Sequence, residues 1–144
     1  MTTGPATGSV HGTAVAVDGR GLLIVGGTGT GKSALALAMI GLGAKLVSDD
    51  QTLLSLAKGD VMLTCPNPDL SGVIEARNVG LLRTEAIAGA PLTLVVDLDL
   101  TETERLPPRR SVTVLGCVID LVYGTQSPTF PVALMLHLRH GRYA

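Results

Sequence analysis

The stretch GLLIVGGTGTGKS, residues 21–33, joins an apolar run to a glycine-rich loop. Its last eight residues fit the pattern G-x-x-x-x-G-K-[ST], with Gly26, Gly31, Lys32 and Ser33 at the fixed positions. The run before the loop is typical of a β-strand, and the residues from Lys32 onward are helix formers. Because the pattern and its context agree, the stretch predicts a phosphate-binding loop between a strand and a helix.

The residue types of this loop suit a polyphosphate. Glycines let backbone N–H groups close around a phosphate, and these groups add to the positive end of the helix dipole. Lys32 would neutralise phosphate oxygens, and the Ser33 hydroxyl would bind Mg²⁺. The simpler alternative is a flexible turn with a solvated lysine. We expect ATP and Mg²⁺ as cofactors, with the nucleotide held by Gly26, Gly27, Thr28, Gly29, Thr30, Gly31, Lys32 and Ser33.

Short turns separate the first predicted strands. Asp18-Gly19 and Lys58-Gly59 each lie between β-type runs, so both predict hairpins. Parallel neighbours would need longer connections than these turns provide. The sequence therefore predicts an α/β fold with a mixed sheet. The sequence also predicts strands at 44–48, 91–99 and 111–123 and a helix at 132–140. The helix that begins at Lys32 is expected to stop at Gly41 and Gly43, and its apolar face would carry Leu35, Met39 and Leu42.

Composition narrows the classes of protein. The 144 residues are enough for one domain with a real core, and 46% of them are hydrophobic but only 2% aromatic. The formal net charge is −1 and the basic residues are scattered, so we expect no nucleic-acid partner. No apolar stretch approaches the roughly 20 residues of a membrane span, and the first ten residues lack the features of a secretion signal. We expect a cytoplasmic protein without a membrane partner.

Two places offer the carboxylate that a phosphoryl-transfer site needs. Asp97 follows the apolar run LTLVV in the manner of a Walker B strand, although any buried strand before a turn has this form. Asp49 and Asp50 follow the strand after the loop helix, and would lie beside the loop if the two strands are neighbours. Adjacent residues on an extended chain point in opposite directions, so one could face an acceptor and the other a metal. A turn-starting Asp pair is the alternative reading.

Four motifs in order resemble the bacterial HPr kinase/phosphorylase family, specifically its C-terminal catalytic domain. They are His11-Gly12, the loop, Asp49-Asp50 and the segment GVIEARNVG at residues 72–80, which is close to the family signature G-x-I-E-x-R-G-x-G. The similarity covers nearly the whole chain from His11 onward, so we expect residues 1–144 to be a single such domain. The resemblance implies a P-loop fold related to that of phosphoenolpyruvate carboxykinase.

The resemblance also implies a serine protein kinase that transfers phosphate from ATP to the HPr phosphocarrier protein. Asp49 would be the acid/base at the HPr serine, and His11 and Arg77 would line the transfer site. Asp50 and Glu75 would hold Mg²⁺ together with Ser33. A homo-oligomer is implied as well, since the family typically forms hexamers.

The chain departs from the family pattern at two places. Asn78 stands where the signature has Gly, and Asn tolerates the left-handed backbone region better than most residues. The family usually carries an arginine-bearing loop ahead of its last helix, whereas the segment from Gln126 to Pro131 has no basic residue. We therefore expect the reverse reaction, phosphorolysis with inorganic phosphate, to be weak.

Two other functions stay open at the level of sequence. One is a generic P-loop NTPase or small-molecule kinase that uses Asp97 as its Walker B carboxylate. The other is a regulatory sensor in which ATP binding alone changes a protein contact. For Glu75 and Arg77 the alternative is a purely structural role. Two residues that are two positions apart on an extended segment can form a surface ion pair that contributes little free energy.

Overall fold

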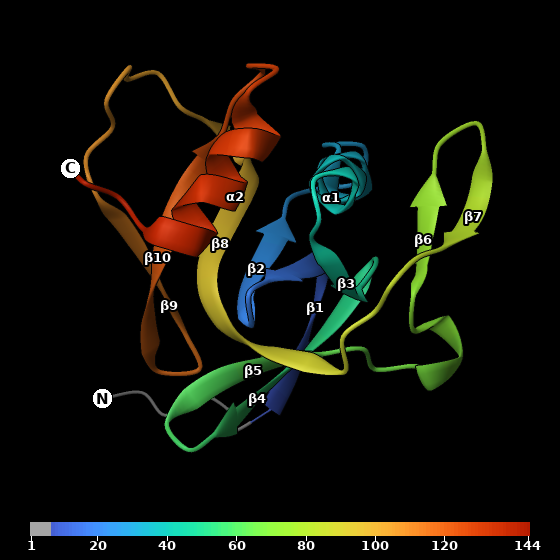
Figure 1. Cartoon of the computed structure of the whole chain (residues 1–144). Helices are drawn as coiled ribbons and strands as arrows, with labels where there is room; N and C mark the ends of the chain where they lie inside the picture. Colours follow the sequence, from blue (N-terminus) through green and yellow to red (C-terminus); the bar gives the residue numbers. More distant parts are fainter. Residues whose placement is uncertain (1–6) are drawn as a thin grey trace.

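The computed structural model describes residues 7–144. Residues 1–6, part of the opening segment considered above for a secretion signal, lie outside this range. The described residues form ten strands, two α-helices and one short 3₁₀ helix. Figure 1 shows how they are arranged. In chain order they are β1 (Thr7–Val17), β2 (Arg20–Val25), α1 (Lys32–Gly41), β3 (Lys45–Ser48), β4 (Gln51–Ala57), β5 (Asp60–Thr64), η1 (Pro68–Leu70), β6 (Val73–Ala76), β7 (Gly80–Arg83), β8 (Gly89–Thr101), β9 (Arg110–Val114), β10 (Cys117–Gly124) and α2 (Phe130–His140).

The two hairpins predicted at Asp18-Gly19 and Lys58-Gly59 are confirmed. Asp18 and Gly19 have φ angles of 51° and 76°, and Lys58 and Gly59 have 53° and 83°. Two consecutive residues with positive φ form the turn whose twist matches that of antiparallel strands. The first of these hairpins, β1–β2, leads directly into the glycine-rich loop.

The sheet is mixed, as predicted. β2 pairs in parallel with β8, and β8 pairs in parallel with β10, while all the other named strand pairs are antiparallel. Successive pairings run β2–β1–β4–β5–β8, and because β8 returns to β2, five strands close into a ring. β3 pairs with the edge of β1 that is opposite to β2. β10 pairs with β8, and β9 pairs with β10, so these two strands extend the sheet outward from β8. The long, bent strands β1 and β8 therefore take part in both the ring and the sheet beneath the helices.

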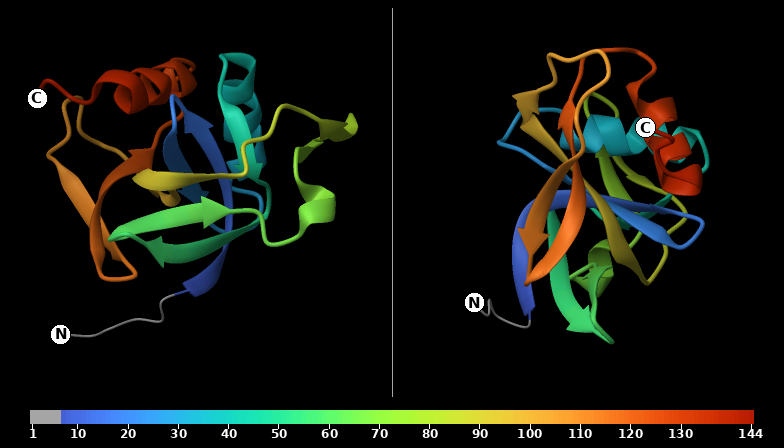
Figure 2. Two further views of the ribbon diagram at one scale, coloured as in Figure 1. Left: turned by 60° about the horizontal axis from the view of Figure 1, so that its bottom comes forward. Right: turned by 90° about the vertical axis from the view of Figure 1, so that its left-hand side faces the viewer.

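Two clusters of apolar side chains lie on opposite faces of the central strands. Val15 of β1 and Leu22 of β2 pack with Met39 of α1 and Leu134 of α2. Their strand neighbours face the other way, where Ala14 and residues such as Leu63 form a cluster among strands alone. Both α-helices cover the same side of the sheet, and β4 and β5 lie on the side away from them (Figures 1 and 2). Few aromatic residues are needed because small aliphatic side chains fill both spaces.

Three local predictions were incomplete. The run 111–123 is a hairpin rather than one strand, because Leu115 and Gly116 adopt φ angles of 47° and 82° and turn the chain between β9 and β10. Residues 73–83 form another hairpin, β6–β7, which stands away from the main sheet (Figure 1). Leu42 follows the last residue of α1 and is exposed, whereas Leu35 and Met39 are buried as expected.

Within residues 7–144, no helix is long and apolar enough to cross a membrane.

Candidate active site

The glycine-rich loop has a conformation that depends on glycine. Gly26, Gly29 and Gly31 have φ angles of 150°, 83° and 99°. A Cβ atom at Gly26 would lie 2.7 Å from the Thr30 Oγ1 atom, which itself donates to the Gly27 carbonyl. α1 begins directly after the loop with no side-chain cap and no acidic residue in its first turn. Its first N–H groups are thus left for an anionic ligand.

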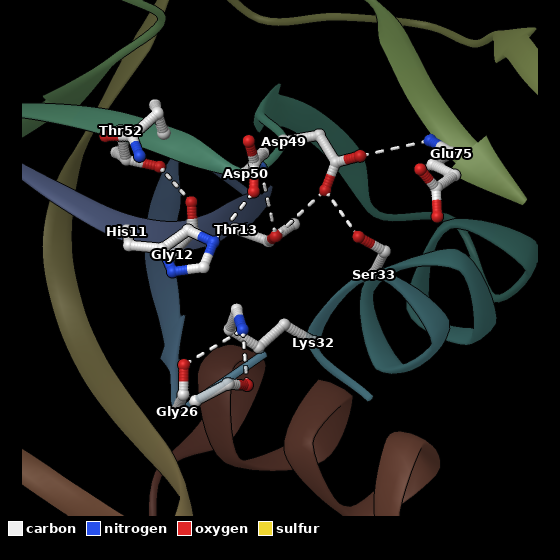
Figure 3. Close-up of polar contacts among 12 residues, drawn as sticks. His11, Gly12, Thr13, Gly26, Lys32, Ser33, Asp49, Asp50, Thr52 and Glu75 are labelled. Carbon is white, nitrogen blue, oxygen red and sulfur yellow. Dashed lines mark hydrogen bonds and ion pairs between the residues drawn. The ribbon is translucent and has the colours of Figure 1, made fainter. Parts of the chain in front are cut away.

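Lys32 is folded back over the start of this loop. Its Nζ atom donates to the Gly26 carbonyl at 2.9 Å and to the Gly27 carbonyl at 2.8 Å (Figure 3). Only 8% of the residue is exposed. An ammonium group with two neutral carbonyl partners and no carboxylate in contact keeps its charge available for an anion in the loop.

Strand order explains why residues far apart in sequence meet beside the loop. β1 lies between β2 and β3 and is antiparallel to both, so β2 and β3 run in the same direction and end at the same edge. Gly12 pairs with Val25 at the end of β2, and Ala14 pairs with Ser48 at the end of β3. The predicted condition that β2 and β3 be neighbours is thus not met, yet Asp49 and Asp50 still reach the loop.

Asp49 is held by three hydrogen bonds. Its Oδ1 atom accepts from the Ser33 hydroxyl at 2.7 Å and from the Thr13 hydroxyl at 2.9 Å. Its Oδ2 atom accepts from the backbone N–H of Glu75 at 3.0 Å (Figure 3). Both carboxylate oxygens are therefore engaged, and one of them touches the serine of the phosphate loop.

Asp50 has different surroundings although it is the next residue. Its φ of 71° turns its side chain away from that of Asp49, toward His11. The Asp50 Oδ1 atom lies 2.8 Å from His11 Nε2, and 74% of the Asp50 side chain is exposed. Since an ionised carboxylate only accepts hydrogen bonds, Nε2 carries the proton in this pair. Asp50 Oδ2 has no partner among residues 7–144, so it is free to accept another proton.

A cavity of about 650 Å³ contains most of the predicted site. The predicted residues that line it are His11, Thr28, Gly29, Gly31, Lys32, Ser33, Asp49, Asp50, Glu75 and Arg77. The loop residues Gly26, Gly27 and Thr30 are not among the residues that line it. β6 and the turn after it carry Glu75 and Arg77 to the cavity, and these two residues form no ion pair with each other within the described part of the chain. Asn78 has a φ of 68°, so it adopts the left-handed backbone region that asparagine tolerates better than most residues.

Two functional positions were missed by the sequence reasoning. Thr13 is fully buried, donates to Asp49 and accepts from the Asp50 backbone N–H at 3.3 Å, so it joins the two aspartates. Its place two residues after His11 on a strand, and hence on the same face, was the available signal. Asp99 accepts from the Gly27 N–H at 2.9 Å and holds the loop entrance. No pattern in the sequence distinguishes it from Asp97.

Asp97 lies where a Walker B residue would, but it does not face the cavity. β8 is the parallel neighbour of β2, and Asp97 pairs with Val25 just before the loop. Its Oδ1 atom accepts from the backbone N–H of Asp99 at 2.9 Å, and the residue is absent from the cavity wall. The carboxylates that do line the cavity are those of Asp49, Asp50 and Glu75.

The residues present fit a nucleotide with Mg²⁺. Within residues 7–144, no group of three or more His, Cys, Asp and Glu side chains is arranged to hold a metal by itself. Mg²⁺ in phosphoryl-transfer sites needs no such group, because one or two carboxylates and substrate phosphates bind it. Ser33 and Asp49 supply adjacent hard oxygen atoms beside the phosphate loop.

The fold and the loop define a P-loop protein with a mixed sheet. Residues 5–103, more than half of the chain, match the model of the HPr serine kinase C-terminal domain. The chain belongs to this family.

Curated relatives agree with this membership. The HPr kinase/phosphorylase of Shouchella clausii is 37% identical over 82 residues, which are 57% of this chain and 26% of that protein. The HPr kinase/phosphorylase of Geobacillus thermodenitrificans is 32% identical over 106 residues, which are 69% of this chain and 34% of that protein. The chain thus spans about a quarter to a third of the length of these relatives.

A solved structure supports the fold. The Hpr(Ser) kinase/phosphatase from Coxiella burnetii matches with a TM-score of 0.76 and 23% sequence identity. The match covers 92% of this chain and 88% of that chain. The architecture described above is therefore one that a solved protein shares over nearly its full length.

Proposed function

We propose that the chain is the catalytic domain of an ATP-dependent kinase that phosphorylates a serine of HPr in the cytoplasm. The observation that carries the proposal is that the loop lysine, three carboxylates, a histidine and an arginine all line one cavity. Family membership supports HPr as the acceptor, because the curated relatives are named for it. The β- and γ-phosphates of ATP belong in the loop, with Lys32 and the first N–H groups of α1 as their partners.

The geometry favours Asp50 over Asp49 as the general base. Asp50 lines the cavity and has one oxygen without a partner among residues 7–144, whereas both oxygens of Asp49 are occupied. We assign to Asp50 Oδ2 the removal of the proton from the acceptor serine as the serine oxygen attacks the γ-phosphorus, the bond from this phosphorus to the bridging oxygen breaks, and ADP leaves. His11 Nε2–H holds the other oxygen and fixes the carboxylate in place. This exchanges the roles that the sequence resemblance implied for the two aspartates.

Asp49 and Ser33 are then the residues that hold the metal. Their oxygens are 2.7 Å apart, so one cation could contact both after the hydroxyl rotates. Bound Mg²⁺ would supply positive charge to the phosphate oxygens. Thr13 and the Glu75 N–H keep Asp49 directed toward the loop. Glu75 can add a further carboxylate, and Arg77 can stabilise charge on the transferred group.

The generic NTPase is the second candidate, because Asp97 does lie next to the loop strand. It is disfavoured by the cavity, which Asp97 does not line. A sensor without catalysis has no need for a carboxylate with an unpartnered oxygen in the wall of this cavity, so Asp50 disfavours it as well.

A transfer assay tests the proposal. The chain is incubated with Mg²⁺, labelled ATP and HPr, and label on an HPr serine is the expected result. Lys32→Ala should abolish both the transfer and ATP binding by calorimetry, since it removes the only ammonium group that lines the cavity. An HPr variant with alanine at the acceptor serine is the matched substrate control. Release of phosphate without labelled HPr would favour the NTPase, and ATP binding without turnover would favour the sensor.

A further inference from the structure

Two aspartates near the end of β8 lie beside the phosphate loop without lining the cavity of the candidate active site. Asp97 pairs in parallel register with Val25, the last residue of β2. Two residues further along both strands, Asp99 is level with Gly27, and its Oδ1 atom accepts from the Gly27 N–H at 2.9 Å. Neither aspartate is among the residues that line the cavity, so the proposed transfer reaction leaves both without a role.

An irregularity of β8 puts Asp99 in this position. Asp97 pairs with Tyr123 of β10, and Thr101 pairs with the residue that follows Tyr123. The register therefore skips the residues of β8 between these two, Asp99 included. Irregularities of this kind re-aim side chains and are common next to active sites. The Asp97 Oδ1 atom accepts from the backbone N–H of Asp99 at 2.9 Å, which fixes the course of the chain at this point.

One peptide group connects Asp99 to the lysine of the loop. The carbonyl of Gly26 and the N–H of Gly27 belong to the same planar peptide group. The carbonyl accepts from Lys32 Nζ at 2.9 Å (Figure 3), and the N–H donates to Asp99 Oδ1 at 2.9 Å. An ammonium group and a carboxylate thus lie at opposite ends of one peptide group, and both favour the same orientation of it.

The orientation of this peptide group is not fixed by the backbone, because glycines stand on both sides of it. Turning the group over changes only ψ of Gly26 and φ of Gly27, and glycine has few steric limits on either angle. Gly26 already has a φ of 150°, which L side chains rarely adopt. If the group turned over, its carbonyl would face away from Lys32. The ammonium would then lose one of its two carbonyl partners.

We propose that Asp99 is a positioning residue of the phosphate loop. It fixes the peptide group between Gly26 and Gly27, and through this group it holds the Lys32 ammonium where the phosphates bind. Asp97 acts one step earlier, because its carboxylate orients Asp99. The consequence for nucleotide binding rests on the proposed function, since it takes the loop to be an ATP site. The consequence for Lys32 itself does not.

Two substitutions of Asp99 isolate the hydrogen-bond acceptor. Asp99→Ala removes the acceptor, whereas Asp99→Asn removes the charge but keeps an Oδ1 atom that can accept from the Gly27 N–H. Asp99 is exposed, so neither change leaves a cavity in the core. Asp120→Ala is the matched control for the loss of a negative charge. Asp120 is exposed on β10, does not line the cavity and forms no ion pair within residues 7–144.

The first measurement needs neither ATP nor HPr. The chain is treated with acetic anhydride, and mass spectrometry gives the rate of acetylation at each lysine. Lys32 is 8% exposed and hydrogen-bonded, so it should react more slowly than the exposed Lys58, which serves as the internal standard. In Asp99→Ala the rate at Lys32 relative to Lys58 should rise severalfold. In Asp99→Asn and Asp120→Ala the relative rate should stay near that of the unmodified chain.

The second measurement is calorimetry with Mg-ATP and, separately, with Mg²⁺ and inorganic tripolyphosphate. Asp99→Ala should lower both affinities by a similar factor of roughly ten, as expected for the loss of one hydrogen bond to a charged group. The factor should be similar because Lys32 meets the phosphates that both ligands carry. Asp99→Asn should restore most of the affinity. A defect in folding alone would instead lower the number of binding sites per chain and leave the affinity of the remaining sites unchanged.

Several results would overturn the inference. An Asp99→Ala variant with the Lys32 reactivity or the affinities of the unmodified chain would do so. An Asp99→Asn variant as impaired as Asp99→Ala would also do so, because the charge and not the acceptor would then matter. These results would leave the HPr kinase proposal standing. Conversely, the expected pattern in a chain that never labels HPr would support the role of Asp99 and sink the kinase proposal.

Discussion

Asp49 and Asp50 are adjacent in sequence but have different hydrogen-bond partners. In an extended chain they would point to opposite faces, and that much follows from the sequence. Which of them meets Ser33 depends on the φ of 71° at Asp50 and on Thr13, which contacts both residues. The phosphate loop and the Asp pair were therefore predictable from local patterns. Their different surroundings were not, because Thr13, which contacts both residues, lies 36 residues away in sequence from Asp49.

Single substitutions at these positions should have different effects. Asp50→Asn keeps the shape but removes the proton acceptor, so it should retain Mg-ATP affinity and lose transfer to HPr by about a hundredfold or more. Asp49→Asn removes the negative charge beside Ser33, so it should weaken ATP binding only when Mg²⁺ is present. Calorimetry with and without Mg²⁺, together with the transfer rate, measures both effects.

The reverse pattern would restore the roles implied by the family resemblance. In that case Asp49→Asn would bind Mg-ATP normally and fail in transfer, while Asp50→Asn would be impaired in metal-dependent binding. Asp97→Asn serves as a third arm. If this variant alone loses the ability to use Mg-ATP, the metal-binding carboxylate is on the Walker B strand, and the result favours the generic NTPase.

Among the elements, the connection from β8 to β9 is held by one ion pair at its two ends. Arg110 Nε donates to Glu102 Oε1 at 3.1 Å, and Nη2 donates to Oε2 at 3.0 Å. The guanidinium carbon lies 4.1 Å from the centre of the Tyr123 ring, and only 12% of the Glu102 side chain is exposed. The bidentate bond to Arg110 lowers the pKa of Glu102 below its ordinary value of 4.5. This bidentate pair joins the two ends of the β8–β9 connection and stabilises the charged form of Glu102.

The lowered pKa gives a pH-dependent prediction. A carboxyl group with a lower pKa in the folded state stabilises the fold above its unfolded pKa, and this contribution is lost as pH falls through the folded pKa. Glu102→Gln should therefore be less stable than the unmodified chain at pH 7, with the difference shrinking below about pH 4.5. Urea unfolding at a series of pH values measures it.

Glu104→Gln is the control for this experiment, because Glu104 is exposed in the same connection and forms no ion pair within residues 7–144. Its stability should follow that of the unmodified chain at every pH. A Glu102→Gln deficit that is constant from pH 7 to pH 3 would show that the pair acts through packing and not through charge.

At the scale of the whole molecule, the mixed sheet could be predicted from the residues in the turns. Asp-Gly and Lys-Gly turns predicted the hairpins that a purely parallel sheet cannot contain. The Leu115-Gly116 turn escaped prediction because leucine seldom adopts positive φ, and only the pairing of β9 with β10 imposes it. The closed ring also lay beyond sequence patterns, since the pairings of β8 with β2 and β5 join segments far apart in the chain.

The distribution of charge over the molecule bears on the direction of the reaction. In phosphorolysis an oxygen of inorganic phosphate attacks the phosphorus of phosphoserine, the bond to the serine oxygen breaks, and pyrophosphate forms. The serine oxygen takes back a proton, which in our proposal comes from Asp50. Free phosphate must be held by the metal ion and by the cationic side chains of the cavity, because no nucleoside anchors it. The basic side chains that line the transfer cavity are Lys32, Arg77 and His11, and the segment from Gln126 to Pro131 adds none.

We therefore expect phosphorolysis to be weaker, relative to the kinase reaction, than in a longer relative such as that of Geobacillus thermodenitrificans. The ratio matters more than either rate, because a difference in folded fraction cancels when both reactions are measured in one preparation. Pyrophosphate released from serine-phosphorylated HPr is compared with label transferred from ATP, for each protein at the same phosphate concentration. A smaller ratio in this chain, with a higher phosphate concentration needed for half-maximal rate, is the expected result. Equal ratios in the two proteins would mean that Lys32, Arg77 and His11 suffice to hold phosphate. The absence of an arginine from the segment between Gln126 and Pro131 would then have no effect on the reverse reaction.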